Sequence, residues 1–151
     1  MPHLSLHTPV GDITVFEEDG ALVSLDWGWV SNQASSPILN SACHQLHAYF
    51  SGELTTFDLP LAPAGTAYRR GVWRALCNIP YGETRTYQDI AIKAGGSARS
   101  VGQANGYNPI PLIIPCHRVV AVRHMGGYSG GDGLATKHWL LALESSNATL
   151  V

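Results

Sequence analysis

The first 62 residues of this 151-residue chain contain no lysine and no arginine, although they hold seven acidic side chains. All nine basic residues lie in residues 63–151, beside only four acidic ones. The two parts therefore carry formal charges of −7 and +5, although the whole chain carries only −2. Such a split can arise by chance, but it also indicates that the second part meets a polyanion and the first does not.

Long apolar runs and paired cysteines are missing as well. No stretch approaches the ~18 consecutive apolar residues of a membrane-spanning helix. The N-terminus has no basic segment followed by an apolar one, so we expect neither a membrane partner nor a secretory signal. The three cysteines, an odd number at irregular spacing, disfavour a disulfide framework and indicate a cytoplasmic protein.

The first part predicts a small sheet and one helix. Three alternating segments separated by turn residues are typical of strands, at 4–8, 12–18 and 21–27. Apolar residues at helical spacing within 37–54 predict a helix that stops near Gly52. We therefore expect an N-terminal α/β domain over residues 1–62, with a proline-containing linker after it.

The second part predicts mostly short helices. Thr66, Thr86 and Ser97 are suited to cap the helices that follow them. The second and third of these helices are joined by a glycine-containing turn and predict a helix-turn-helix. The remaining expected elements are an extended segment at 108–122, a glycine-rich loop at 126–133 and an amphipathic helix at 134–144. The fold class is thus α/β (α+β), with the mostly helical domain over residues 63–151.

The sequence "IPCHRV" places a cysteine where the chain is most apolar. A thiol becomes a nucleophile as the thiolate, which basic neighbours such as His117 and Arg118 favour. Adjacent side chains on a strand face opposite ways, so contact between Cys116 and His117 needs a bent backbone or a bridging water. Pro115 makes the approach to the cysteine rigid. The alternative is an inert core cysteine beside two basic residues that point to the surface.

Four blocks of the sequence resemble one known family, in order: "LHAYFSGELTTFDLPL", "VWRALCNIPYGETRTYQDIA", "ARSVGQANGYNPIPLIIPCHRVV" and "GGYSGGDGLATKHWLLALE". They are similar to the O6-alkylguanine-DNA alkyltransferases, also called methylated-DNA–protein-cysteine methyltransferases. The resemblance covers most of the chain. It implies a catalytic domain with a winged helix-turn-helix that binds the minor groove of double-stranded DNA containing O6-alkylguanine. It further implies a monomer that flips the damaged nucleotide into a pocket beside the cysteine and uses no cofactor.

The resemblance also assigns roles to single residues. It implies that Cys116 takes the alkyl group irreversibly and that His117 is linked through a water molecule to Glu144. By the same resemblance, Asn108 holds the turn that positions the cysteine. Tyr87 donates a proton to the departing guanine. O4-alkylthymine is left open as a second substrate.

Other residues match the DNA-contacting parts of the family. Arg99 corresponds to the arginine that enters the base stack in place of the flipped nucleotide. The other implied DNA contacts lie in the same helix and are Ala98, Ser100, Gly102, Gln103, Ala104 and Gly106. The implied base pocket contains Pro115, Val119, Tyr128 and Ser129. One departure adds positive charge near the domain junction, because many relatives have an aromatic residue and a glutamine where this chain has Arg69-Arg70.

The residue chemistry agrees with these roles. Displacing guanine from an alkyl carbon needs a soft nucleophile and neutralisation of the leaving purine, which a thiolate and a phenol supply. The product is a thioether, which water does not cleave at neutral pH, so each molecule should act once.

Two other functions remain open at this point. A non-catalytic binder of alkylated DNA would lack the acceptor cysteine, whereas Cys116 is present. A Cys–His hydrolase would need neither a helix-turn-helix nor a charge split, and it would turn over repeatedly. Cys43 and His47 are four residues apart on an expected helix and could present two metal ligands, but a zinc site needs more than two, so we expect no metal.

Overall fold

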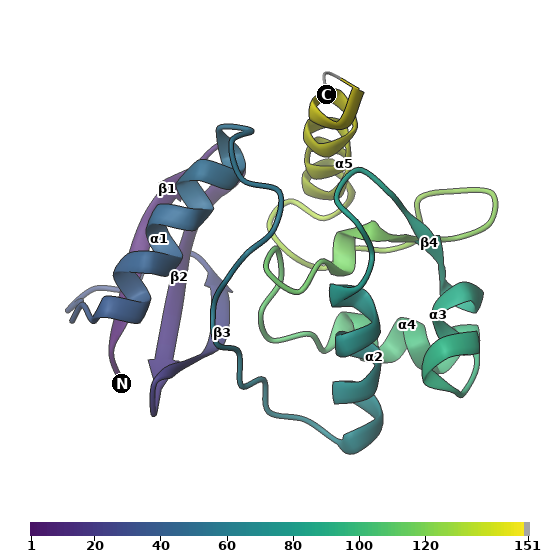
Figure 1. The fold of residues 1–151 in the computed structure, drawn as a ribbon, viewed down its shortest axis with the longest axis horizontal. Coiled ribbons are helices and arrows are strands. Elements are labelled where there is room, and N and C mark those ends of the chain that lie inside the picture. The colour runs from purple at the N-terminus through teal and green to yellow at the C-terminus, as the bar shows by residue number, and fades with distance from the viewer. Residues whose placement is uncertain (150–151) are drawn as a thin grey trace. The chain divides into compact units, whose positions relative to one another are not determined.

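The computed structural model describes residues 1–149, with side chains as far as Asn147, and the chain divides into two compact units at Ala64/Gly65 (Figure 1). The first unit contains an antiparallel sheet of three strands in the order β1-β2-β3: β1 His3–Thr8, β2 Gly11–Glu18 and β3 Ala21–Trp27. Helix α1, Pro37–Phe50, packs against β1 and β2. The predicted strands and helix are confirmed.

The core of the first unit follows from the strand register. Leu6 pairs with Ile13 and Val15 pairs with Leu25, and all four side chains are buried. Apolar residues of α1 at helical spacing complete this core: Leu39, Ala42, Leu46 and Tyr49. Burial of one face of the sheet against one face of the helix is what the alternating pattern predicts.

Three short helices form the first half of the second unit: α2 Ala67–Cys77, α3 Tyr87–Ala94 and α4 Ala98–Gly106. The predicted caps are confirmed, because the side-chain oxygens of Thr66, Thr86 and Ser97 each accept from the backbone N–H three residues later. The helices α2, α3 and α4 pack against one another. Buried Trp73 on α2 donates its indole N–H to the Ala104 carbonyl of α4 at 2.8 Å, which fixes how these two helices cross.

The expectation of an extended segment at 108–122 is wrong for most of its length. Residues 109–114 form turns, residues Cys116–Arg118 form a 3-10 turn (η1), and only Val119–Val120 (β5) is a strand, which pairs in parallel with β4, Arg85–Thr86. Three prolines between 109 and 115 remove the N–H donors that a ladder of strand hydrogen bonds needs. The apolar side chains are buried as predicted, but they pack from turns.

The last helix, α5, is Leu134–Thr149 and is longer than the expected 134–144. It follows the glycine-rich loop at 126–133. None of the helices in residues 1–149 combines the length and the apolar character that a bilayer span requires.

Candidate active site

Two asparagines hold the backbone on either side of Pro115. Asn108 Nδ2 donates to the Ile114 carbonyl at 2.9 Å, and its Oδ1 accepts from the Ile110 N–H at 3.0 Å. Asn105 Nδ2 donates to the Cys116 carbonyl at 3.3 Å. The thiol of Cys116 is therefore presented from a turn that is fixed at both ends, and the residue is only 5% exposed.

The side chains that follow the cysteine meet one carboxylate. His117 Nε2 lies 2.6 Å from Glu144 Oε2, and Arg118 reaches the same carboxylate with Nε at 2.8 Å and Nη2 at 3.1 Å. The expectation that a water molecule links His117 to Glu144 is wrong, because the two side chains are in direct contact. The tight turn of η1 brings both side chains toward α5, whereas a strand would have separated them. Arg118 is also not a free positive charge near the thiol, since Glu144 neutralises it.

Burial and charge set the protonation of this cluster. Burial works to raise the pKa of Glu144, but hydrogen bonds and charges from His117 and Arg118 outweigh it and hold the pKa at about 2. Burial lowers the pKa of His117. We therefore assign an ionised Glu144 that accepts from a neutral His117, so that Nε2 carries the proton. His117 Nδ1 is then an acceptor, and it is buried with no hydrogen-bond partner in the described part of the chain.

The thiol itself is protonated at rest. Burial raises the pKa of Cys116, and this rise is opposed by hydrogen bonding from Asn108 and by the positive charge of Lys137. The hydroxyl of Tyr128 also faces the thiol and favours the thiolate. The pocket around the sulfur thus combines an apolar enclosure with a small number of groups that stabilise negative charge.

Lys137 is a functional candidate that no sequence motif indicates. Its side chain is fully buried, and Nζ donates to the carbonyls of Val119 at 2.6 Å and Gly127 at 3.1 Å. No carboxylate within the described residues pairs with it. Burial lowers its pKa to about 8, while the negative charge of the Cys116 thiolate acts in the opposite direction. The sequence signal was a lysine on the apolar side of the last helix.

A hollow of about 410 Å³ lies beside the helix-turn-helix. Its lining joins α3 and α4 to the loop after β5: Tyr87, Ala98, Arg99, Gly102, Ala121, His124, Gly126 and Gly127. The Tyr87 hydroxyl accepts from the Gly127 N–H at 3.3 Å. Gly126 has φ +74°, and a Cβ there would lie 2.5 Å from the Tyr87 hydroxyl, so this position needs glycine. Cys116 does not line this hollow.

The structure separates the candidate DNA contacts of α4 into two groups. Arg99, Gln103 and Gly106 are exposed at helical spacing. Ser100 uses its hydroxyl to cap the helix, and Ala104 is only 1% exposed. We therefore remove Ala104 from the candidate contacts, because its side chain faces the core.

The candidate base-pocket residues also differ in exposure. Pro115 and Val119 are buried, and Ser129 is exposed in the loop.

Within residues 1–149, no group of three or more His, Cys, Asp or Glu side chains is placed to hold a metal ion, and this includes the surroundings of Cys43 and His47.

Fold and site together define a two-unit protein in which a helix-turn-helix stands beside a buried cysteine with a His–Glu pair. Family models match both units: the 6-O-methylguanine DNA methyltransferase DNA-binding domain over residues 67–146, and the ribonuclease-like domain of the same protein over residues 3–63. The chain belongs to the 6-O-methylguanine DNA methyltransferase family. The resemblance seen in the four sequence blocks is thus confirmed.

Individual relatives agree over nearly the whole length. A methylated-DNA–protein-cysteine methyltransferase of Methanosarcina barkeri is 43% identical over 94% of this chain and 96% of its own. The constitutive enzyme of Bacillus subtilis is 40% identical over 94% of each chain. The crystal structure of Mycobacterium tuberculosis OGT in complex with DNA has a TM-score of 0.87 and 41% identity, covering 97% of this chain and 94% of that one.

Proposed function

We propose that this protein repairs DNA by moving the alkyl group of O6-alkylguanine irreversibly onto its own Cys116. The observation that carries the proposal is the placement of this buried thiol. It stands one residue before His117, whose Nε2 is paired with Glu144, in a chain whose relatives are named for protein-cysteine methyl transfer. The helix-turn-helix beside it supplies the DNA-binding surface, and the +5 charge of this unit suits a polyanion.

The reaction starts with the thiol proton. No hydrogen bond joins the thiol to Nδ1 of His117, so a bridging water passes the proton from Cys116 to this nitrogen, and His117 becomes an imidazolium that ionised Glu144 stabilises. The thiolate then attacks the alkyl carbon, so that an S–C bond forms while the bond from that carbon to O6 of guanine breaks. The electron pair of the broken bond leaves with the purine.

The leaving purine must gain a proton to become neutral guanine. Tyr87 is the donor in this proposal, because its phenol begins α3 of the helix-turn-helix and its hydroxyl lines the hollow beside that motif. Lys137, Asn108 and Tyr128 stabilise the negative sulfur before attack and lose that role once the neutral thioether has formed. Nothing in the cluster cleaves a thioether, so the protein acts once.

Access to the lesion requires that the nucleotide leave the duplex, since O6 of a stacked base cannot reach a buried thiol. The exposed side of α4 supports binding in the minor groove, with Arg99 at the hollow to fill the gap in the stack. We infer that the C-terminal domain carries both DNA binding and chemistry, and that the protein works as a monomer without a cofactor. Three free cysteines are consistent with the cytoplasm.

Intact-mass spectrometry after incubation with duplex DNA containing O6-methylguanine tests the proposal. We expect one added methyl group per protein molecule, no addition to the Cys116→Ser variant, and repaired DNA that stops at one equivalent of protein. Repaired DNA that exceeds the protein concentration would instead support a hydrolase-like enzyme. No methyl addition to the parent protein would leave only a DNA-binding function.

A further inference from the structure

The exposed side of α4 does not end at the helix. Arg99, Gln103 and Gly106 are exposed, and the next exposed position at this spacing is Tyr107, the residue that caps the helix C-terminus. Tyr107 is 63% exposed. Its ring is covered on one face by Arg69 of α2, whose guanidinium carbon lies 3.9 Å from the ring centroid.

The position of Arg69 is fixed by contacts that its neighbours on α2 make with α4 and with the turn before it. Tyr68, the preceding residue, bonds with its hydroxyl to the Gly95 carbonyl at 2.9 Å and to the Ser100 hydroxyl at 2.8 Å. One turn further along α2, the indole N–H of buried Trp73 donates a hydrogen bond to the Ala104 carbonyl of α4. The first turn of α2 is thereby held against both ends of α4, and the guanidinium of Arg69 is presented at the end of the exposed helix side.

The charge of Arg69 is not used inside the protein. No carboxylate among the described residues lies within ion-pair distance of it, and the first turn of α2 contains no acidic residue. A guanidinium stacked on an aromatic ring keeps its edge N–H groups free, and this edge matches the geometry of phosphate oxygens. Because the ring holds the guanidinium in place, less conformational entropy is lost when it binds an anion.

We propose that Arg69, stacked on Tyr107, forms a phosphate clamp that binds the DNA backbone beside the groove that α4 enters. Tyr107 is eight residues from Arg99, or about 12 Å along the helix. The minor groove is only about 6 Å wide, so a cation at that distance reaches the phosphates that border the groove while Arg99 lies within it. The proposal rests on DNA as the proposed partner of this unit and adds a sequence-independent contact to it.

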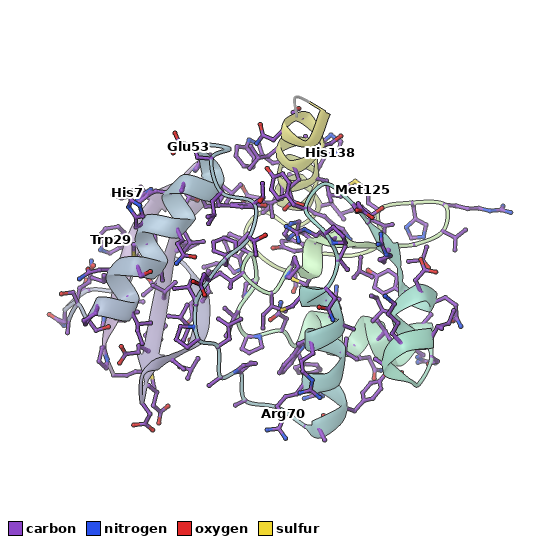
Figure 2. The ribbon with its side chains drawn as sticks, viewed as in Figure 1. His7, Trp29, Glu53, Arg70, Met125 and His138 are labelled. Carbon is purple, nitrogen blue, oxygen red and sulfur yellow. The ribbon has the colours of Figure 1, made fainter. Side chains whose placement is uncertain are left out.

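The test compares four single variants and one double variant with the parent protein by titrating undamaged duplex DNA at several salt concentrations. Arg69→Ala should weaken binding about tenfold, as expected for one charged hydrogen-bonding contact, and should lower the slope of log affinity against log salt by about one. Arg74→Ala is the matched control, because it removes an exposed arginine from the other end of α2. The exposed neighbour Arg70 is labelled in Figure 2 and is left unchanged.

Two substitutions at Tyr107 distinguish the contribution of the stacked ring to DNA affinity from the contribution of the Arg69 charge alone. Tyr107→Phe keeps the ring and should bind as the parent does. Tyr107→Ala should weaken binding roughly threefold, as expected for an exposed cation–π pair, but should have almost no effect when Arg69 is already alanine.

The proposal is overturned if Arg69→Ala costs no more affinity than Arg74→Ala, or if the two losses at Arg69 and Tyr107 simply add. Binding to undamaged DNA needs no chemistry, whereas reaction with free O6-methylguanine needs no DNA. Measuring both on each variant therefore distinguishes failure of the clamp from failure of alkyl transfer: every clamp variant should react with the free base at the parent rate.

Discussion

The buried turn that carries Cys116 and the open hollow beside α4 are built in opposite ways. Around the turn, His117, Arg118 and Glu144 of α5 are at most 6% exposed, and both basic side chains contact the Glu144 carboxylate. In the hollow, Arg99 is exposed and the wall is completed by a glycine-rich loop. The difference indicates that the nucleophile is preorganised before DNA arrives, while the DNA-facing side depends on contacts that only DNA supplies.

The largest expected effect concerns the stability of the buried cluster. Glu144→Gln leaves the buried guanidinium of Arg118 without its counter-charge and should lower the free energy of unfolding by about 3–5 kcal/mol. Urea unfolding measures this loss. The matched control is Glu83→Gln, which breaks an exposed ion pair with Arg85 and should cost no more than about 1 kcal/mol. Equal losses would show that the buried cluster is no more important than a surface pair.

The same carboxylate predicts a pH dependence. The folded pKa of Glu144 is about 2, below its ordinary value of 4.5, so the ionised form stabilises the fold. This contribution is complete above the unfolded pKa and is lost as pH falls through 4.5 toward about 2. The Glu144→Gln variant should lose less stability than the parent over that interval. An identical fall in both proteins would remove Glu144 as the source.

On the DNA-facing side, Arg99→Ala should impair repair of duplex DNA much more than reaction with free O6-methylguanine. Extrusion of a base costs a few kcal/mol, which corresponds to roughly 10²-fold in rate, and the free base has no such cost. Rate constants for both substrates at saturation give the comparison. If only affinity and its salt slope change, Arg99 is a phosphate contact and does not enter the base stack.

Tyr87→Phe should slow transfer by roughly 10²-fold at saturating DNA, with little change in binding. The phenol acts on charge that develops as guanine leaves, so its loss affects the transition state more than the bound complex. Single-turnover rates and binding titrations separate the two effects. Equal rates for variant and parent would exclude Tyr87 as the proton donor.

Lys137→Met should have the smallest effect. Removing the positive charge raises the pKa of Cys116 further, so the rate of alkyl transfer at neutral pH should fall about tenfold per unit of pKa, and its pH profile should move to higher pH. Arg123→Met removes an exposed cation from the neighbouring loop and should leave the profile in place. An unshifted profile for Lys137→Met would show that the lysine only supports the loop through its hydrogen bonds.

The sequence predicted the parts of this site that local rules determine. Thr86 and Ser97 cap the helices they precede because capping depends on neighbours three residues away. The sequence did not reveal Lys137 or Asn105, since their partners lie 10 to 18 residues away and only the folded turn brings them together. The prediction of an extended segment at 108–122 is wrong because a buried turn and a buried strand give the same apolar pattern, and the prolines there prevent strand pairing.

The central claim is that the acceptor is the buried cysteine and not an accessible one. Cys77 is exposed, whereas Cys116 is only 5% exposed, so accessibility alone favours Cys77. Peptide mapping after reaction with DNA containing O6-methylguanine, and in parallel with iodoacetamide, tests the claim directly. We expect DNA to place its methyl group on Cys116 alone, while iodoacetamide labels Cys77 first. Methyl transfer from DNA to Cys77 or Cys43 would contradict the account.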